Sequence, residues 1–192
     1  MLRSRTALGG MVTAPHHLAS EAGRDILREG GNAVEAMIAA AATIAVVYPH
    51  MNAIGGDGFW LISAPGKDPV AIRACGGAAG LATPGFYREQ GKDAIPARGP
   101  LAALTVAGAI GGWIKAAEVA ASLGGKIPHS RLMADAVHHG KAGVPITKSQ
   151  VALTTTKMAE LKDAPGYVDT YAANGIPAIG DVLKQPALAA TL

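Results

Sequence analysis

A capped, almost wholly apolar helix followed by a glycine-rich turn is the feature that most limits how this chain can fold. Asn32 suits a helix N-cap, and Glu35, three residues later, can accept a hydrogen bond from the amide of the cap. From Ala33 to Val47 the only charged residue is Glu35, and apolar residues lie on every face, which predicts a helix buried inside the molecule. Pro49 ends that helix, and the three glycines within Gly55–Gly58 predict a tight turn that leads into a strand.

The composition favours one globular domain that binds neither nucleic acid nor membrane. The chain has 192 residues, of which 49% are apolar, so it can build a sizeable core. Its net charge is +3, and its 17 basic and 14 acidic residues are scattered without a Lys/Arg block, which argues against a nucleic-acid partner. The apolar run from Ala36 to Val47 is shorter than the roughly 20 residues that a membrane-spanning helix needs.

The amino terminus and the cysteine usage predict a cytoplasmic protein. Arg3 and Arg5 are followed by Ala7–Gly10 and not by an apolar segment of about 7 to 15 residues, as a secretory signal would require. Cys75 is the single cysteine, so the chain cannot form an internal disulfide.

Patterning along the rest of the chain predicts a layered α+β fold. Extended runs at residues 58–64 and 70–75 flank the turn-rich segment Pro65–Pro69, which is typical of a hairpin. The other expected elements are a short strand at Met11–Thr13, a surface helix at Leu18–Glu29, a short helix from Thr83-Pro84, and longer helices at Ala107–Leu123, Ser130–His139 and Thr147–Lys162. Helices packed on a sheet hairpin suggest two or more layers around one core.

The carboxyl terminus predicts that the chain is part of a longer polypeptide. Pro186 is a favourable first residue of a helix, and Ala187–Leu192 begins an apolar helical pattern that has no C-cap glycine. Such a helix cannot stand alone, because isolated helices shorter than roughly 12 to 15 residues are marginal in water. We therefore treat residues 1–192 as a single, incomplete domain.

Several motifs together make the chain similar to the amino-terminal part of the large subunit in the γ-glutamyltransferase family. They are Ala14–Ser20, Ala22-Gly23, Ile26-Leu27, Gly30–Ala36, Ile54–Phe59, Gly108–Trp113, Gly143–Ile146 and Lys184–Leu192. The resemblance implies part of a four-layer αββα sandwich of the amino-terminal-nucleophile hydrolase type, here its helix-rich amino-terminal portion. It also implies a precursor that cuts itself and needs no cofactor.

The same resemblance implies that the catalytic nucleophile lies outside this chain. In the family the nucleophile is a threonine at the start of the small subunit, whose own α-amino group can serve as the base. No catalytic residue is therefore expected here, and the expected partner is the remainder of the same precursor. A dimer of such heterodimers is one assembly that the resemblance allows.

Arg73 is the candidate substrate-binding residue, since the family binds the substrate carboxylate with a large-subunit arginine on the strand after the hairpin. Aligned without a gap, the arginine position of γ-glutamyltransferases falls at Cys75, and in many acylase-like relatives an arginine comes at the place of Gly77. Strand side chains alternate, so Arg73 would share a face with both positions if the strand continues that far. The alternative is an exposed hairpin arginine. The absence of an arginine at position 75 argues against γ-glutamyl specificity and leaves room for a smaller acidic amide as substrate.

Other chemistry-bearing residues have structural interpretations. Thr154–Thr156 lie within a helical pattern without a cleavage signal. The pairs His16-His17 and His138-His139 lack the spacing of a metal site, so we expect no metal. Gly55–Gly58 follows a helix and precedes a strand, the reverse of a phosphate loop. Cys75 is taken as a small apolar strand residue.

The resemblance implies the amino-terminal portion of a self-processing amidase that acts through an acyl-enzyme on a terminal threonine, and the altered arginine strand favours a small acidic amide as its substrate. Oxamate-type amidohydrolases are one such relative. The first alternative is a γ-glutamyl transferase or hydrolase that acts on glutathione-like substrates. The second is a non-catalytic scaffold or binding protein that keeps part of the fold. A Thr-Thr-type cleavage site followed by a glycine pair, downstream of Leu192, would distinguish the enzyme.

Overall fold

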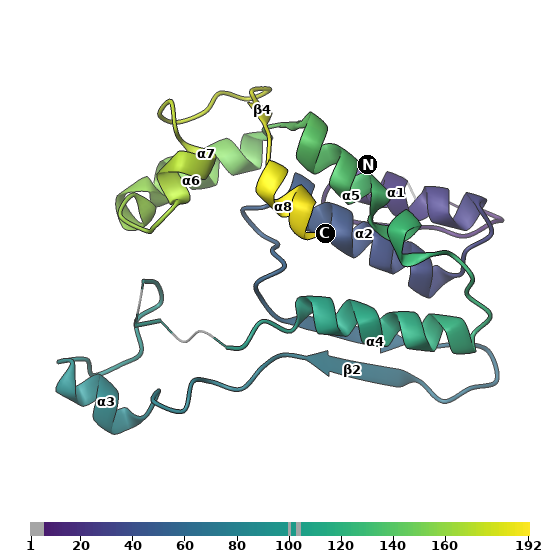
Figure 1. The fold of residues 1–192 in the computed structure, drawn as a ribbon, viewed down its shortest axis with the longest axis horizontal. Coiled ribbons are helices and arrows are strands. Elements are labelled where there is room, and N and C mark those ends of the chain that lie inside the picture. Colours follow the sequence, from purple (N-terminus) through teal and green to yellow (C-terminus); the bar gives the residue numbers. More distant parts are fainter. Residues whose placement is uncertain (1–5, 100, 103–104) are drawn as a thin grey trace.

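The computed structural model describes residues 6–99, 101–102 and 105–192, which form a helix-rich α+β fold around one central helix (Figure 1). The central helix α2 (Ala33–Val47) contacts α1 (His17–Arg28), α4 (Ala109–Ser122) and α5 (His129–Ala142). The other elements are β1 (Gly58–Ile62), β2 (Val70–Ala74), α3 (Pro84–Glu89), β3 (Val144–Pro145), α6 (Lys148–Leu161), α7 (Tyr167–Tyr171), β4 (Val182–Leu183) and α8 (Pro186–Thr191).

The start of α2 is held by the capping box that the sequence predicts. Oδ1 of Asn32 accepts hydrogen bonds from the amides of Val34 at 3.1 Å and Glu35 at 3.0 Å. In return, Oε2 of Glu35 accepts a hydrogen bond from the amide of Asn32 at 2.7 Å. These bonds satisfy amides that the first turn of a helix leaves without intrahelical partners, so the helix begins at Ala33.

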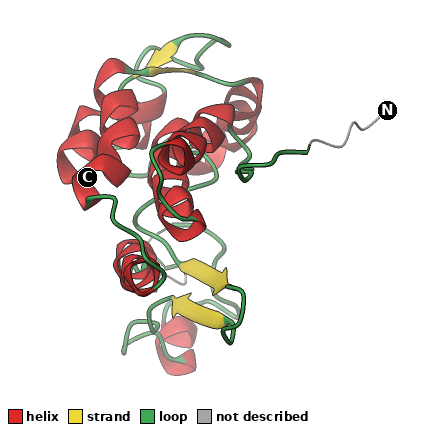
Figure 2. Cartoon of the chain, turned by 90° about the vertical axis from the view of Figure 1, so that its right-hand side faces the viewer, coloured by secondary structure: helices red, strands yellow, loops and turns green. Residues whose placement is uncertain are grey.

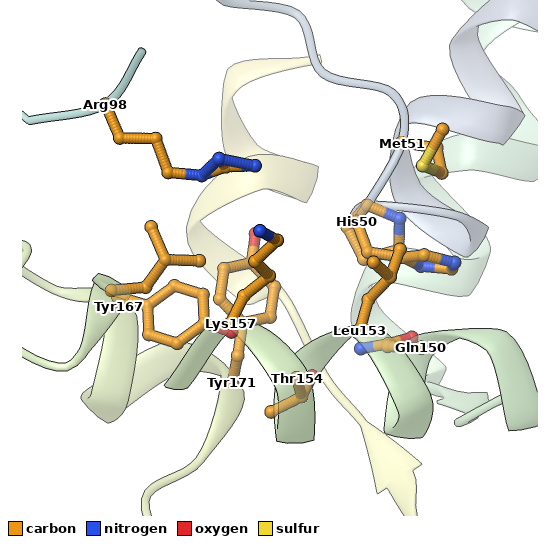
Figure 3. A pocket seen from close by; sticks show the side chains of 11 residues that line it. His50, Met51, Arg98, Gln150, Leu153, Thr154, Lys157, Tyr167 and Tyr171 are labelled. Carbon is orange, nitrogen blue, oxygen red and sulfur yellow. The ribbon is translucent and has the colours of Figure 1, made fainter. Parts of the chain in front are cut away.

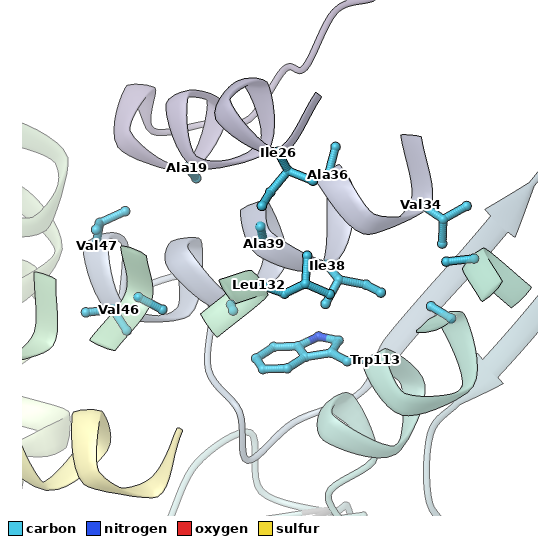
Figure 4. Close-up of a cluster of buried hydrophobic side chains, with 14 of the residues drawn as sticks. Ala19, Ile26, Val34, Ala36, Ile38, Ala39, Val46, Val47, Trp113 and Leu132 are labelled. Atoms are coloured by element: carbon cyan, nitrogen blue, oxygen red, sulfur yellow. The ribbon is translucent and has the colours of Figure 1, made fainter. Parts of the chain in front are cut away.

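The core surrounds α2 on most of its faces, as Figure 4 shows. Ile38 is 1% exposed and packs in the same cluster as Ile26 of α1, Leu132 of α5 and Trp113 of α4. Two positions depart from the prediction of burial, because Ala33 in the first turn is exposed and Met37 is 41% exposed. The helix is therefore buried on three sides, and an apolar stripe that includes Met37 stays open.

The predicted hairpin is present, and α4 covers one of its faces. β1 and β2 pair antiparallel, and Phe59 is opposite Arg73. A Cβ added at Gly112 would lie 2.7 Å from the Cβ of Ala74 and 3.2 Å from Nε1 of Trp60, so the helix approaches this face closely only because Gly112 has no side chain. In Figure 2 the hairpin and α4 lie below the main group of helices.

Two details of the sequence-based topology were wrong or incomplete. Residues 11–13 form no strand, because the segment has no partner strand among the described residues and Val12 packs its side chain against Gly23 of α1. The short antiparallel pair β3–β4 and the single-turn helix α7 were not expected. Two-residue strands and five-residue helices are too short to leave a periodic pattern in the sequence.

The last helix packs back onto the core. Gly140 of α5 is close to Ala189 of α8, since a Cβ added at Gly140 would lie 2.8 Å from the Cβ of Ala189. Nε2 of Gln185 donates a buried hydrogen bond of 2.8 Å to the carbonyl oxygen of Val46 at the end of α2. Within the described ranges, every helix is too short or too polar to cross a bilayer.

Candidate functional site

Arg73 lies on the open face of the hairpin. Because Trp60 and Ala74 meet α4, strand alternation places Phe59, Leu61 and Arg73 on the opposite face. Phe59 is 70% exposed and Leu61 is 80% exposed, and Arg73 is exposed beside them. No carboxylate among the described residues lies within salt-bridge distance of Arg73. Its guanidinium is thus available to a group outside the described chain.

Strand β2, which carries Arg73, ends before it reaches Gly77. β2 ends at Ala74, and the following segment pairs instead with the segment before α4, through a bridge between Ala78 and Thr105 and a 3.2 Å hydrogen bond from the amide of Val106 to the carbonyl of Gly77. Cys75 is half-buried, unlike the exposed Arg73. Arg73, Cys75 and Gly77, which strand alternation would place on one face, therefore have different surroundings.

The glycine turn before β1 fixes the start of α4 next to this strand end. The carbonyl oxygen of Gly56 accepts hydrogen bonds from the amides of Gly108 and Ala109, both at 3.0 Å. Asp57 Oδ1 accepts a 2.9 Å hydrogen bond from the hydroxyl of Thr105. A Cβ at Gly108 would lie 2.3 Å from the carbonyl oxygen of Ala74. The turn is therefore a packing element, as the sequence predicted, and it also caps the start of α4.

A separate cavity of about 400 Å³ lies beside α6 and α7 (Figure 3). Its charged lining residues are Arg98, from the loop before α4, and Lys157 of α6. Figure 3 shows both side chains pointing toward the same end of the cavity, with Tyr167 and Tyr171 of α7 below them. Burial and the nearby Tyr167 raise the pKa of Tyr171, so its phenol stays protonated at neutral pH.

The other end of this cavity combines polar side chains with the apolar Met51 and Leu153 (Figure 3). Gln150 is 3% exposed and Thr154 is 4% exposed, and both line the cavity from α6. His50 contributes from the loop after α2, where its Nε2 lies 3.1 Å from the hydroxyl of Ser149. Nδ1 of His50 is buried and has no hydrogen-bond partner among the residues that the structure describes. Burial lowers the pKa of His50, so this imidazole is neutral at pH 7.

His16, one of the histidines for which the sequence favoured a structural role, caps a helix. Nδ1 of His16 accepts a 3.3 Å hydrogen bond from the amide of Leu18 and so caps α1. His16 stacks on His17 with ring centroids 4.7 Å apart. Burial, with a contribution from neighbouring histidines, lowers the pKa of His16. No group of three or more potential metal ligands occurs in the described part of the chain.

Two of the three threonines in the α6 run, Thr155 and Thr156, have the ordinary role of helical threonines. The hydroxyls of Thr155 and Thr156 donate to the carbonyls of Val151 at 2.8 Å and Ala152 at 3.0 Å. Both side chains are exposed, which fits a structural role.

Sequence reasoning missed the cavity beside α6. Its cations come from segments about sixty residues apart, which no local pattern joins. Two sequence signals could have pointed to it. Tyr167 and Tyr171 have i,i+4 spacing and Lys157 and Glu160 have i,i+3 spacing, and each spacing places two side chains on one helix face.

Comparison with known proteins identifies relatives over the whole chain. The family model described as Gamma-glutamyltranspeptidase matches residues 19–192. An oxamate amidohydrolase proenzyme from Klebsiella pneumoniae is 52% identical over 100% of this chain and 36% of its own length. A glutathione hydrolase-like proenzyme, YwrD, from Bacillus subtilis is 35% identical over 95% of this chain and 34% of its own length.

Solved structures give the same result for the fold. The gamma-glutamyltranspeptidase of Pseudomonas nitroreducens superimposes with a TM-score of 0.82 at 32% identity, over 97% of this chain and 54% of that chain. The chain spans about a third of the length of the curated relatives it matches. The rest of those relatives has no counterpart in these 192 residues.

Proposed function

This chain belongs to the gamma-glutamyltranspeptidase family, and on that basis we propose that it is the amino-terminal, large-subunit portion of a self-processing amidase that hydrolyses a small acidic amide in the cytoplasm. The observation that carries the proposal is the 52% identity to an oxamate amidohydrolase proenzyme over all of this chain. The proteins named as glutathione hydrolases match at lower identity, 33% for the one from Bacillus subtilis. Oxamate is itself a small acidic amide, with its carboxylate bonded directly to the amide carbon.

In this proposal Arg73 binds the substrate carboxylate. Its exposed position on the open hairpin face, next to Phe59 and without a described carboxylate partner, leaves the guanidinium ready for an anion. The planar guanidinium offers two parallel N–H donors, a geometry that suits a carboxylate better than the point charge of a lysine. The neighbouring apolar side chains would lower the local dielectric and strengthen the pair.

The remainder of the precursor supplies the chemistry and covers the open face. A terminal threonine hydroxyl attacks the amide carbonyl, its proton passes through the α-amino group to the leaving ammonia, and water then hydrolyses the acyl-enzyme. The name proenzyme, carried by relatives of which this chain spans about a third, supports a processed precursor as partner. Residues 1–192 thus act as scaffold and pocket wall.

The test uses the full-length gene product. We expect it to cleave itself into two subunits on incubation, visible on a denaturing gel, and the processed protein to release ammonia from oxamate faster than glutamate from glutathione. A full-length protein that cuts itself but prefers glutathione would favour the γ-glutamyl alternative. A protein that neither cuts itself nor releases either product would contradict the enzyme proposal and favour a scaffold.

A further inference from the structure

The cavity beside α6 and α7 is separate from the hairpin that carries Arg73. None of its described lining residues belongs to β1 or β2, and its walls come from the loop after α2, from Arg98 and from α6 and α7. At about 400 Å³ it is within the size range of small-molecule sites.

The charges at one end of the cavity are not balanced. Nε of Arg98 lies 3.3 Å from Oε2 of Glu160, and Nζ of Lys157 lies 2.8 Å from its Oε1, so a single carboxylate serves two cations. The hydrogen bond from Lys157, with the charge of Arg98, lowers the pKa of Glu160, which keeps that carboxylate ionised. One net positive charge remains, and both charged residues that line the cavity are cations.

The opposite end of the cavity carries polar side chains that could hydrogen-bond to a ligand. Gln150 and Thr154 are almost completely buried, and both line the cavity from α6. Nδ1 of His50 is also buried and unpaired. Buried polar groups in native proteins normally have partners, so the unpaired Nδ1 of His50, next to the buried Gln150 and Thr154, indicates an uncharged polar group of a ligand.

We propose that this cavity binds a small organic monocarboxylate, with the carboxylate between Arg98 and Lys157 and an uncharged hydrogen-bonding group toward Gln150, Thr154 and His50. Tyr167 and Tyr171 line the cavity below the two cations, with ring centroids 5.6 Å apart (Figure 3). Charge-assisted bonds to the cations supply the attraction for the anion, and the buried amide and hydroxyl select its polar end. The proposal does not rest on the proposed amidase activity.

The experiment measures binding of 4-oxopentanoate to the full-length protein by ligand-observed NMR. This probe has a carboxylate at one end and a ketone near the other, and it has no amide that the protein could hydrolyse. Its methyl ester is the neutral control and should bind at least about tenfold more weakly, because it lacks the charge that Arg98 and Lys157 attract. Equal affinity for acid and ester would overturn the proposal.

Variants locate the binding and separate it from the hairpin. Arg98→Gln and Lys157→Gln should each weaken 4-oxopentanoate binding about tenfold. The matched control is Lys115→Gln, since Lys115 pairs with Glu118 on α4 in the same i,i+3 arrangement but lies outside the cavity, and it should change nothing. Arg73→Ala distinguishes the two sites: loss of binding in Arg73→Ala with retention in Arg98→Gln would place the anion on the hairpin and refute the cavity site.

A gain-of-affinity variant tests the charge argument directly. Glu160→Gln removes the carboxylate that both cations share, so 4-oxopentanoate should bind several-fold more tightly. An unchanged or weaker affinity in a folded Glu160→Gln protein would contradict the proposed placement of the carboxylate. Absence of binding in the unsubstituted full-length protein would refute the site as a whole.

Discussion

The side chain of Glu35, at the start of α2, accepts a 2.7 Å hydrogen bond from the backbone amide of Ile127, which lies 92 residues later in the chain. The same carboxyl group accepts the amide of Asn32 at 2.7 Å through its other oxygen. Glu35 is 3% exposed, so water cannot replace either bond. One side chain therefore closes the capping box of α2 and fixes the segment between α4 and α5.

Replacing Glu35 with Ala should destabilise the full-length protein by about 3 kcal/mol or more, because two backbone amides lose their partner and one of them is remote. Glu35→Gln keeps one acceptor oxygen and should cost less. Urea unfolding of each variant measures the change, with Glu89→Ala, on the exposed end of α3, as control. A cost near that of an ordinary cap, about 1 kcal/mol, would mean that the bond to Ile127 adds nothing.

Ile38→Asp should cost several kcal/mol, since Ile38 is 1% exposed and the new carboxylate would have no partner in the core. Met37→Asp changes the neighbouring residue of the same helix, which is 41% exposed, and should cost much less. Thermal unfolding of the two full-length variants compares them. Similar melting temperatures for both would contradict the burial of α2 on this face.

Neighbouring glycines of α4 should respond in opposite directions to the same substitution. Gly112→Ala places a methyl 2.7 Å from the Cβ of Ala74 and should destabilise by about 1 to 3 kcal/mol through overpacking. Gly111 has open space around its Cβ position, so Gly111→Ala should stabilise by about 0.5 to 1 kcal/mol. Urea denaturation of both variants provides the measurement, and a stabilising Gly112→Ala would show that α4 packs on the hairpin less closely.

Stability should fall as the pH falls below about 6.5, because burial first, and then His17, His139 and His50, lower the pKa of His16 from its ordinary value of 6.5. Only Glu21 opposes this shift. When the pKa of a histidine is lower in the folded protein than in the unfolded chain, the unfolded chain binds a proton at a higher pH. Lowering the pH therefore destabilises the fold, until the pH falls below the pKa of the folded state.

The variant His16→Asn isolates this contribution, since asparagine can still cap α1 but does not titrate. Its unfolding free energy should depend less steeply on pH between about pH 7 and pH 5 than that of the parent. His129→Asn, at the exposed start of α5, is the control. Parallel curves for His16→Asn and the parent would assign the acid sensitivity to other groups.

Arg73→Ala should lower kcat/KM for an acidic amide by about one to two orders of magnitude in the processed full-length enzyme, through loss of a charge-assisted bond to the substrate. Arg73→Lys should restore only part of the rate, because a point charge lacks the planar fork. Steady-state kinetics with oxamate and with a neutral amide of similar size separate the effects. Equal losses for both amides, or no loss for either, would mean that Arg73 is only an exposed hairpin residue. Arg88→Ala, on α3, is the control.

Local chemistry made much of the fold predictable. Asn32 and Glu35 mark the start of α2 within four residues, Pro49 follows its end, and the pattern of the hairpin is contained within residues 58–75. The family resemblance and the α+β class are confirmed by the matching family model and by a TM-score of 0.82.

Contacts between distant segments were not predictable. The bond from Ile127 to Glu35 and the approach of Arg98 to Glu160 join segments that share no periodicity. Met11–Thr13 has strand-like residues, but a strand needs a partner, and the fold provides a helix surface instead. The role of Arg73 stays a prediction, because an exposed guanidinium is equally compatible with a substrate carboxylate and with solvent.

The bond between Glu35 and Ile127 also sets an order of events during synthesis of the chain. On a ribosome, α1 and α2 are complete once Val47 has emerged, but the partner of Glu35 arrives only after residues 48–127. Their synthesis takes about 4 to 16 s at roughly 5 to 20 residues per second. For that time the nascent pair of helices has its apolar faces uncovered by α4 and α5, and any slowly translated stretch within residues 48–127 lengthens the exposure.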